Sequence, residues 1–373
     1  MTMSASFTIR VVISLEEFKG LAREWEQLLR AVPGHSLFLT WEWLYYWAKH
    51  FLRDNRLWII VMRDGNGSLV GVAPFYLHRT VQALVPVREL RFLGSEGVCS
   101  SYLDVIVDEQ RKRAVFQCLY RYLFNQGRGE WDVLTLSEVP AESSSVDEWN
   151  ALFDEAGKVG EVVSTTCCPV IRLPHDVQTY RAGLGRNRRY TLQRKTKCLQ
   201  AAGRIQYSRA TRPADVGPAF ESLMALHQRR WMHGSNGGVF AGESLKQFHQ
   251  EVVQVLSERG RVSIDLLELD GRAIAAIYGF VYEGIYYFYL PGFDPVALPK
   301  ASPGLLLLSH RIEQAIRDGE RMVDLLQGAQ RYKLDRCTDL RRLITVRYYN
   351  RHVRAMALKL FESAKQAIKI SAR

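Results

Sequence analysis

The spacing of apolar and polar positions divides the first half of the chain into alternating helices and strands. Asp64-Gly65-Asn66-Gly67 separates two apolar runs and is typical of a hairpin turn. A polar, serine-rich stretch follows the last strand of this series. The expected order is helix, helix, strand, strand, strand, helix, strand, at residues 15–29, 41–51, 57–62, 69–76, 102–107, 111–125 and 131–136.

The second half repeats the same order. Asp270-Gly271 again separates two apolar runs, and Gly319 precedes the last one. Two mixed α/β (α+β) domains of one topology, each a mostly antiparallel mixed sheet flanked by helices, are the simplest explanation. The corresponding elements are expected at residues 216–230, 244–258, 262–269, 273–282, 285–290, 304–318 and 322–326.

The region between the repeats sets the expected domain limits. A helix at 147–156 and a strand at 161–173 precede Pro174 and His175, which open a basic segment. We expect an N-terminal domain at 1–174, a C-terminal domain at 175–350 and an amphipathic basic helix at 351–373.

Composition is that of a globular protein. Of the 373 residues, 47% are hydrophobic and 24% charged, which excludes wholesale disorder. The first residues lack an apolar signal core, and no apolar run is long enough to span a bilayer. The six cysteines show no Cys-x-x-Cys spacing, so no metal site is expected. A cytoplasmic location follows, with contact to the inner membrane surface as an option.

The net charge of +11 is concentrated in two segments. Residues 177–214 contain ten Lys/Arg and no acid, and residues 331–373 contain twelve Lys/Arg against three acids. The rest of the chain is therefore acidic on balance, and the basic segments predict an anionic partner. Leu358, Leu360 and Phe361 give the tail an amphipathic pattern that fits docking on its own protein or on anionic lipid.

The segment 285–318 resembles an anion-binding strand-loop-helix unit. An apolar, aromatic strand is followed by Ser302-Pro303-Gly304, with Ser302 as N-cap and Pro303 as first helical residue. The exposed N–H groups of such a helix start suit a pyrophosphate. An ordinary helix start is the alternative.

A second group of candidates lies at 322–334. Asp324 interrupts a buried apolar strand, where a carboxylate needs a partner or a function. It fits a general base, or alternatively a structural ion pair with an arginine. Lys333, next to Tyr332, fits a group that stabilises an oxyanion or holds the acceptor, or alternatively a solvated surface lysine.

Basic and aromatic residues form the remaining candidates. A helix at about 187–201 carries Arg188 and Arg189, and Arg186, Arg189 and Lys197 are expected to share one face. That face fits phosphates, or alternatively water alone. His227 and His249 fit acid/base or structural roles, and no triad order accompanies them. Residues 234–238 are expected to form a glycine-rich loop over a cleft.

These elements together resemble the CelD-like (BioF-associated) acetyltransferase family of the GCN5-related N-acetyltransferase (GNAT) superfamily, which is related to the Fem peptidyltransferases. The likeness is specific over about 181–335 and topological over the first 160 residues. The motifs that carry it are Arg188-Arg189, Gln228-Arg229-Arg230-Trp231, Leu269-Asp270-Gly271, Gly292-Phe293-Asp294, Ser302-Pro303-Gly304, Asp324-x-x-x-Gly328 and Tyr332-Lys333.

The resemblance implies tandem GNAT folds and transfer of an acyl group, expected to be acetyl, from acyl-CoA to an amine or hydroxyl. The acceptor would be a sugar, a polysaccharide precursor or a related small molecule, as in cell-envelope or exopolysaccharide synthesis. The Gln/Arg-x-x-Gly-x-Gly/Ala phosphate loop of ordinary GNAT enzymes is absent. The expected site consists of catalytic Asp324, Lys333 and Tyr332, donor-binding Leu290, Gly292, Ser302, Pro303 and Gly304, and acceptor-binding Arg188, Arg189, Arg230, Trp231 and His249.

Two alternatives remain open. One is a Fem-like transferase that uses an aminoacyl-tRNA donor, in which a lysine near the position of Lys333 assists; the chain lacks an evident coiled-coil arm, which disfavours it. The other is a module that has kept the fold, lost the chemistry and binds a membrane surface or nucleic acid through its basic segments. A nucleic-acid partner is disfavoured, and the chain is expected to be a monomer or dimer.

Overall fold

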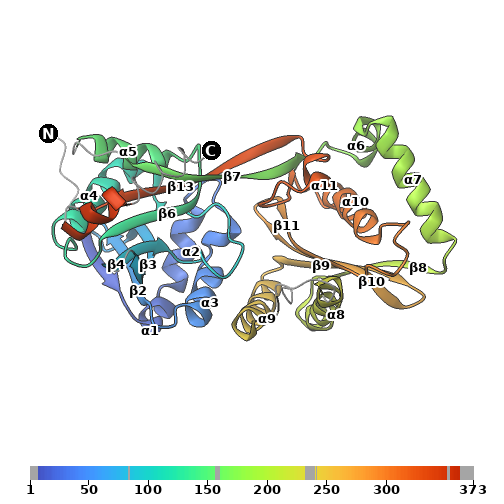
Figure 1. The fold of residues 1–373 in the computed structure, drawn as a ribbon, viewed down its shortest axis with the longest axis horizontal. Helices are drawn as coiled ribbons and strands as arrows, with labels where there is room; N and C mark the ends of the chain where they lie inside the picture. The colour runs from blue at the N-terminus through green and yellow to red at the C-terminus, as the bar shows by residue number, and fades with distance from the viewer. Residues whose placement is uncertain are drawn as a thin grey trace. The chain divides into compact units, whose positions relative to one another are not determined.

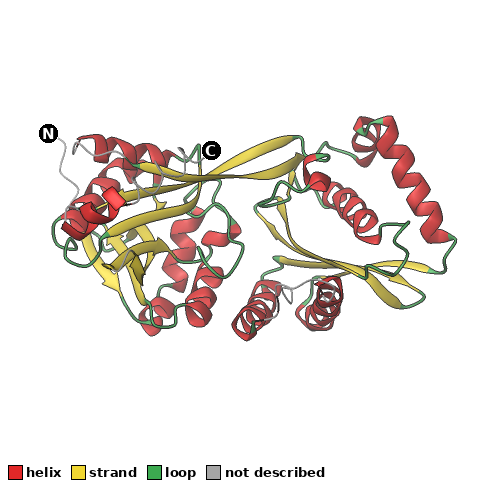
Figure 2. Ribbon diagram, viewed as in Figure 1, coloured by secondary structure: helices red, strands yellow, loops and turns green. Residues whose placement is uncertain are grey.

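A computed structural model describes residues 7–82, 85–155, 160–231, 240, 242–350 and 353–361. The chain forms two compact units, Cys167–Arg341 and the two segments that flank it, Met1–Thr166 and Arg342–Arg373. The chain therefore passes from one unit to the other within two strands, near residues 166 and 341. Helices and strands alternate along both units (Figures 1 and 2).

The flanking segments form unit 1. Its strands lie in the order β1-β2-β3-β4-β6-β13, antiparallel except for the parallel pair β4 and β6, and β5 adds a short pairing to β3. Its elements are β1 (Thr8–Val12), α1 (Leu15–Gly20), α2 (Ala22–Arg30), η1 (Leu37–Leu39), α3 (Trp41–Phe51), β2 (Arg56–Arg63), β3 (Leu69–Gln82), β4 (Val85–Phe92), β5 (Ile106–Val107), η2 (Glu109–Arg111), α4 (Lys112–Phe124), β6 (Val133–Pro140), α5 (Ser144–Glu155) and β13 (Asp339–Tyr349).

Unit 2 has the same topology. Its strands lie in the order β8-β9-β10-β11-β12-β7, antiparallel except for the parallel pair β11 and β12. Its elements are β7 (Glu161–Arg172), α6 (Val177–Gly183), α7 (Arg186–Gln200), β8 (Ile205–Ala210), α8 (Pro213–Trp231), α9 (Glu243–Glu258), β9 (Val262–Leu269), β10 (Arg272–Tyr282), β11 (Ile285–Phe293), α10 (Pro303–Arg317), β12 (Met322–Asp324) and α11 (Arg331–Leu334).

In both units a helix links the fourth and fifth strands, α4 in unit 1 and α10 in unit 2. The sixth strand comes from elsewhere in the chain: β13 follows unit 2 in sequence yet completes the sheet of unit 1, and β7 precedes the helices of unit 2. The repeated order of elements expected from the sequence is therefore a repeated fold, which confirms the mixed α/β prediction.

The faces of the unit 2 sheet are covered differently. α10 packs on β9, β10 and β11 from one side, and α8 and α9 lie on the other (Figure 1). Alternation along β11 sends Tyr286 and Phe288 into the core cluster that contains α10, together with Val323 and Leu325 around β12. Tyr287, Tyr289 and Asp324 therefore face the opposite side.

The sequence patterns misplaced several elements. The strand expected at 102–107 is reduced to β5, because Tyr102 has a left-handed φ of 61° and the Leu103 N–H donates to the Glu138 carbonyl. Its place in the sheet is taken by β4, which was not predicted, like β1, β8 and β13. The helix expected at 15–29 is divided at Leu21 into α1 and α2.

The C-terminal tail is described over a helix at 353–361. Ala355 and Leu358 are buried in a cluster with Val87, Val133 and Tyr349 of unit 1. Other apolar residues of this helix are exposed, Leu360 to 72%. One face of the amphipathic tail thus docks on its own unit; residues 362–373 lie outside the described part.

The domain limits expected at 174/175 and 350/351 remain predictions. The compact units group residues in space, and this grouping does not test which segments fold on their own. None of the helices in the described part of the chain combines the length and apolar character that a bilayer crossing needs.

Replacing Gly279 of β10 by alanine is expected to lower the free energy of unfolding by about 1–3 kcal/mol, because the new methyl group has no room. A Cβ there would lie 2.6 Å from the Tyr287 carbonyl oxygen and against the Tyr286 hydroxyl. Urea unfolding measures the change. Gly183→Ala is the control, since a Cβ there meets no described residue within 4 Å apart from its chain neighbours and its own helix backbone. Equal effects of both variants would contradict the packing assignment.

Candidate functional site

The parallel pairing of β11 and β12 is short. It joins Ile285–Tyr287 to Met322–Asp324, after which β12 ends while β11 continues to Phe293 alongside β10. Leu326, two residues past Asp324, turns the chain away with a left-handed φ of 54°. Among the residues that the structure describes, no strand pairs with β11 on its β12 side beyond Tyr287.

Asp324 is the last residue of β12 and lies where the two strands separate. Its side chain is fully buried, one carboxylate oxygen accepts the Leu326 N–H at 2.8 Å, and the other lies 4.0 Å from Arg341 Nη1. Burial, followed by the charge of Asp324, raises the pKa of the neighbouring Tyr287. Asp324 therefore has an arginine partner, Arg341, as expected of a structural ion pair. It also lies at the strand separation, where a general base is expected.

Lys333 and Tyr332 lie on α11, just after this loop. Lys333 is buried, and its ammonium donates to the carbonyl oxygens of Gln327 at 2.7 Å and Leu326 at 3.4 Å. The alternative of a solvated surface lysine is therefore wrong: the residue holds the loop that leaves Asp324. Tyr332 is half-buried, with its ring centre 6.5 Å from that of Phe288.

The start of α10 follows the predicted order, with Ser302 at the N-cap position and Pro303 as the first residue. Ser302 is left-handed, with φ 50°, and its hydroxyl does not cap the helix as an N-cap serine usually does. Lys195 of α7 instead donates to Ser302 Oγ at 2.5 Å and to the Lys300 carbonyl at 3.3 Å. A cation therefore lies beside the N-terminus of a 15-residue helix.

The two donor-site candidates on β11 have different surroundings. Leu290 is half-buried and pairs with Tyr278 of β10. Gly292 is a packing residue, because a Cβ there would lie 3.0 Å from both the His227 nitrogen and the Leu223 carbonyl of α8. Close approach of helix to strand explains this glycine without a ligand.

His249 of α9 is buried in an aromatic cluster on the side of the sheet opposite α10. Its Nε2 lies 3.4 Å from the hydroxyl of Tyr289, and burial lowers its pKa to about 3, so the ring is neutral at pH 7. Tyr289 lies two residues beyond the end of the parallel pairing. The sequence did not single it out, although the aromatic run on β11 was a signal.

Arg188 and Arg189 lie on different sides of α7. Arg189 lines a groove between α7 and α10, whereas Arg188 is half-buried and its charge acts on Tyr180. The shared face expected for Arg186, Arg189 and Lys197 is only partly realised, because Arg186 does not line that groove. The side chains of Arg230 and Trp231 and the glycine-rich stretch at 234–238 lie outside the described residues.

The family model of the acetyltransferase (GNAT) domain matches residues 186–334, which cover most of unit 2. Unit 2 is a GNAT domain. The match includes the strand separation, Asp324, Lys333 and the start of α10, and it identifies the protein as an enzyme of the acyltransferase class. No protein of curated function has a sequence that matches the chain.

Solved structures extend the likeness to both units. FemX is similar over 92% of this chain and 97% of its own, with 10% identity and a TM-score of 0.58. A C-terminal domain described as that of a lysylphosphatidylglycerol synthetase from Agrobacterium fabrum matches over 94% and 96%, with 11% identity and 0.53. A tandem GNAT protein from the clavulanic acid biosynthesis pathway matches over 92% and 99%, with 13% identity and 0.50. At these identities the likeness concerns the tandem GNAT fold.

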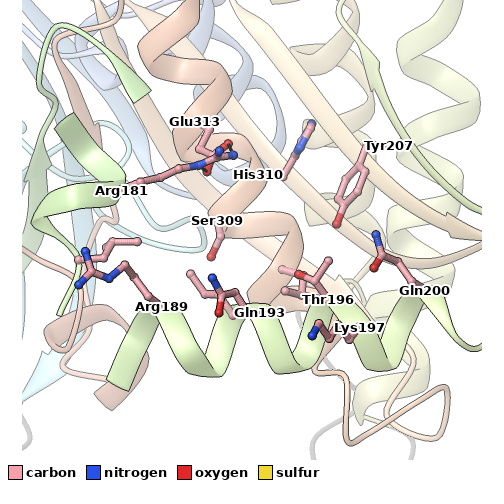
Figure 3. A pocket seen from close by; sticks show the side chains of 13 residues that line it. Arg181, Arg189, Gln193, Thr196, Lys197, Gln200, Tyr207, Ser309, His310 and Glu313 are labelled. Atoms are coloured by element: carbon pink, nitrogen blue, oxygen red, sulfur yellow. Dashed lines mark hydrogen bonds and ion pairs between the residues drawn. The ribbon is translucent and has the colours of Figure 1, made fainter. Parts of the chain in front are cut away.

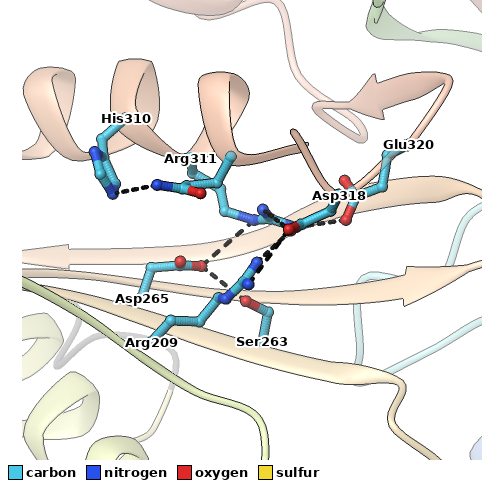
Figure 4. Close-up of polar contacts among 8 residues, drawn as sticks. Arg209, Ser263, Asp265, His310, Arg311, Asp318 and Glu320 are labelled. Carbon is cyan, nitrogen blue, oxygen red and sulfur yellow. Dashed lines mark hydrogen bonds and ion pairs between the residues drawn. The ribbon is translucent and has the colours of Figure 1, made fainter. Parts of the chain in front are cut away.

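A buried ion network fixes the far end of α10 in the GNAT domain (Figure 4). Arg311 is fully buried with its guanidinium 4.1 Å from the ring centre of Tyr286, and it donates to Glu320 at 2.6 Å and Asp318 at 3.2 Å. Asp265 lies 3.6 Å away, and burial raises its pKa to about 6. The network joins α10 to β9 and to the turn before β12, and so holds the C-terminal part of the helix on the sheet.

No group of three or more His, Cys, Asp or Glu side chains in the described part of the chain is placed to ligate a metal.

Replacing Arg311 by methionine is expected to lower the free energy of unfolding by about 3 kcal/mol, because buried acids lose their cation. Thermal and urea unfolding measure this. Arg317→Met, in the same helix but with a half-exposed side chain paired to Glu313, should change stability by less than about 0.5 kcal/mol. A loss at Arg311 as small as that at Arg317 would contradict the network's role.

Proposed function

We propose that the protein transfers an acyl group, acetyl in the first instance, from acyl-CoA to an amine or hydroxyl of a sugar, a polysaccharide precursor or a related small acceptor. The observation that carries the proposal is the separation of β11 from β12, after which β11 continues to Phe293 and the loop that leads into α10. GNAT domains in general use acyl-CoA, which supports this donor.

The pantetheine arm and the pyrophosphate of acyl-CoA match the edge of β11 and the start of α10, respectively. The amide-bearing pantetheine arm can continue the sheet along the unpaired edge of β11. The pyrophosphate suits the N-terminus of α10, where the helix dipole, the Gly304 N–H and the ammonium of Lys195 lie together. A Cβ placed on Gly304 would be in ordinary van der Waals contact with the Phe293 ring, at 3.4 Å, so the end of β11 and the start of α10 lie side by side at this position.

The thioester is already reactive, so the protein's task is to position the acceptor, polarise the carbonyl and remove a proton. In this proposal the acceptor's nitrogen or oxygen attacks the thioester carbon, its proton leaves to a base, and the thiolate departs. Asp324 is that base or orients it, because its carboxylate lies at the strand separation. Lys333 and Tyr332 keep the adjoining loop in place next to the acceptor.

The acceptor side is assigned to the face of the sheet opposite α10. Tyr289 presents its hydroxyl there next to the neutral His249, which orients it. A neutral imidazole in an aromatic cluster favours an uncharged, hydroxyl-rich acceptor over a strongly anionic one at this spot. Arg230 and Trp231, at the end of α8, remain predicted acceptor contacts.

A second candidate function is transfer of an aminoacyl group from tRNA. The run of bases on α7 favours it, as does the similarity of fold to FemX and to a protein described as a lysylphosphatidylglycerol synthetase. The groove beside α7 is of small-molecule size, which favours acyl-CoA.

Acetyl-CoA is expected to bind the purified protein in isothermal titration calorimetry, and Gly304→Ala to weaken that binding about tenfold by placing a methyl group where the phosphate approaches. Gly217→Ala is the matched control, because no atom lies within 4 Å of its Cβ position in α8. If neither acetyl-CoA nor any longer acyl-CoA gives a binding signal in the titration, the donor assignment is refuted.

Ribonuclease treatment separates the two donors. The release of free thiol measures acetyl transfer to a panel of amino sugars and polysaccharide precursors. We expect the rate of this release to be the same before and after the treatment. Transfer that requires charged tRNA and disappears with ribonuclease would establish the second candidate instead.

A further inference from the structure

A groove of about 770 Å³ lies between α7 and α10 in unit 2 (Figure 3). We call it the α7 groove. Its volume is that of a small-molecule site. It is lined by Arg181, Leu184, Arg189, Leu192, Gln193, Thr196, Lys197, Gln200, Tyr207, Leu306, Ser309, His310 and Glu313.

α7 turns polar side chains toward this groove. Arg189, Gln193, Lys197 and Gln200 recur at helical spacing and form one stripe along the lining (Figure 3). A surface helix normally directs its apolar stripe to the body of the protein and its polar residues to solvent. In α7 only Leu199 is buried. Leu192 and Cys198 are partly buried against the same core, while the exposed stripe presents its polar groups to the groove.

The charges in the groove are not balanced. Arg181 forms a two-pronged pair with Glu313, at 2.7 and 2.6 Å, and Glu313 also pairs with Arg317 at 3.3 Å, so the acid that lines the groove is already engaged. No acidic side chain among the described residues pairs with Arg189 or Lys197, two long basic side chains whose Cα positions lie about 12 Å apart along the helix axis. A ligand with about two negative charges would complete this lining.

One end of the groove is aromatic. The rings of Tyr207 and His310 stack with centres 4.1 Å apart and planes 18° from parallel. Burial lowers the pKa of His310, so the stack is uncharged at pH 7. Such a pair offers a flat surface on which a further planar ring can rest.

The α7 groove begins at the proposed pyrophosphate position. Ser302 is four residues before Leu306, and Leu306, Ser309, His310 and Glu313 follow at helical spacing, so all lie along one face of α10. Lys195 of α7 donates to Ser302 Oγ at 2.5 Å and ties α7 to the start of α10 beside the groove. A ligand anchored at the start of α10 therefore lies about one helical turn from Leu306, the first residue of α10 that lines the groove.

We propose that the α7 groove binds the 3′-phosphorylated adenosine end of the acyl-CoA donor, with the phosphomonoester between Arg189 and Lys197 and the base against Tyr207 and His310. This rests on the proposed function. A phosphomonoester carries close to two negative charges at pH 7, and the adenine is planar, so both match the lining. The basic helix would then recognise the 3′-phosphate, while the start of α10 holds the pyrophosphate.

The test compares coenzyme A with 3′-dephospho-coenzyme A, which lacks only the 3′-phosphate, by isothermal titration calorimetry. The unaltered protein should bind coenzyme A at least tenfold more tightly. In the double variant Arg189→Gln/Lys197→Gln this preference should vanish, while the affinity for dephospho-coenzyme A stays the same. Arg194→Gln removes an exposed charge of α7 outside the groove and should keep the preference. Thermal melting verifies that all variants are folded.

The outcomes separate this inference from the donor assignment. Equal affinity of the unaltered protein for the two ligands would overturn the assignment of the α7 groove and leave acyl-CoA as the donor. A preference that survives in the double variant, or that falls equally in Arg194→Gln, would also overturn it. If the unaltered protein binds neither coenzyme A nor 3′-dephospho-coenzyme A, the proposed function itself is refuted.

Discussion

β11 and β12 run side by side for three residues and then separate, and the main features of the candidate site lie at or beside this point. Asp324 ends one strand there, Tyr289 lies on the other, and α10 begins after the loop that follows β11. Parallel strands require a crossover, and the crossover helix covers one face of the sheet. Its N-terminus therefore returns to the edge where the pairing stops, which brings a helix dipole and an unpaired strand edge together.

Buried polar contacts keep that geometry. At the far end of α10, Arg311 holds the helix to the sheet and to the turn before β12. Beside β12, Lys333 closes the loop after Asp324 by donating to two carbonyl oxygens. Each buried cation satisfies acceptors that would otherwise lose their hydration, so removing either one costs more than an exposed pair would. The site is thus supported on both sides by groups that need not touch a substrate.

Unit 1 repeats the strand separation without the same chemistry. The parallel pairing of β4 and β6 joins Glu89–Arg91 to Val133–Thr135, so Thr135 stands where unit 2 has Asp324. Glu89 is buried there and pairs with Arg91 at 2.5 Å. The crossover helix α4 begins at Lys112 with no counterpart of Ser302-Pro303-Gly304. The two copies of the fold are therefore unequal, and the residues suited to acyl transfer lie in the second.

The sequence by itself determined what depends on near neighbours. The order of helices and strands in both halves, the turns before β3 and β10, Pro303 at the first position of α10 and the burial of Asp324 within an apolar strand all follow from periodicity and turn chemistry. Only the tertiary structure decided features that depend on distant segments. β13 pairs with β6 across some 200 residues, and Lys333 donates to carbonyl groups in the interior. Arg189 lines the α7 groove whereas Arg188 does not, and Arg311 is fully buried in α10. In each case a long-range partner supplies the pairing or neutralisation, and no local pattern records that partner.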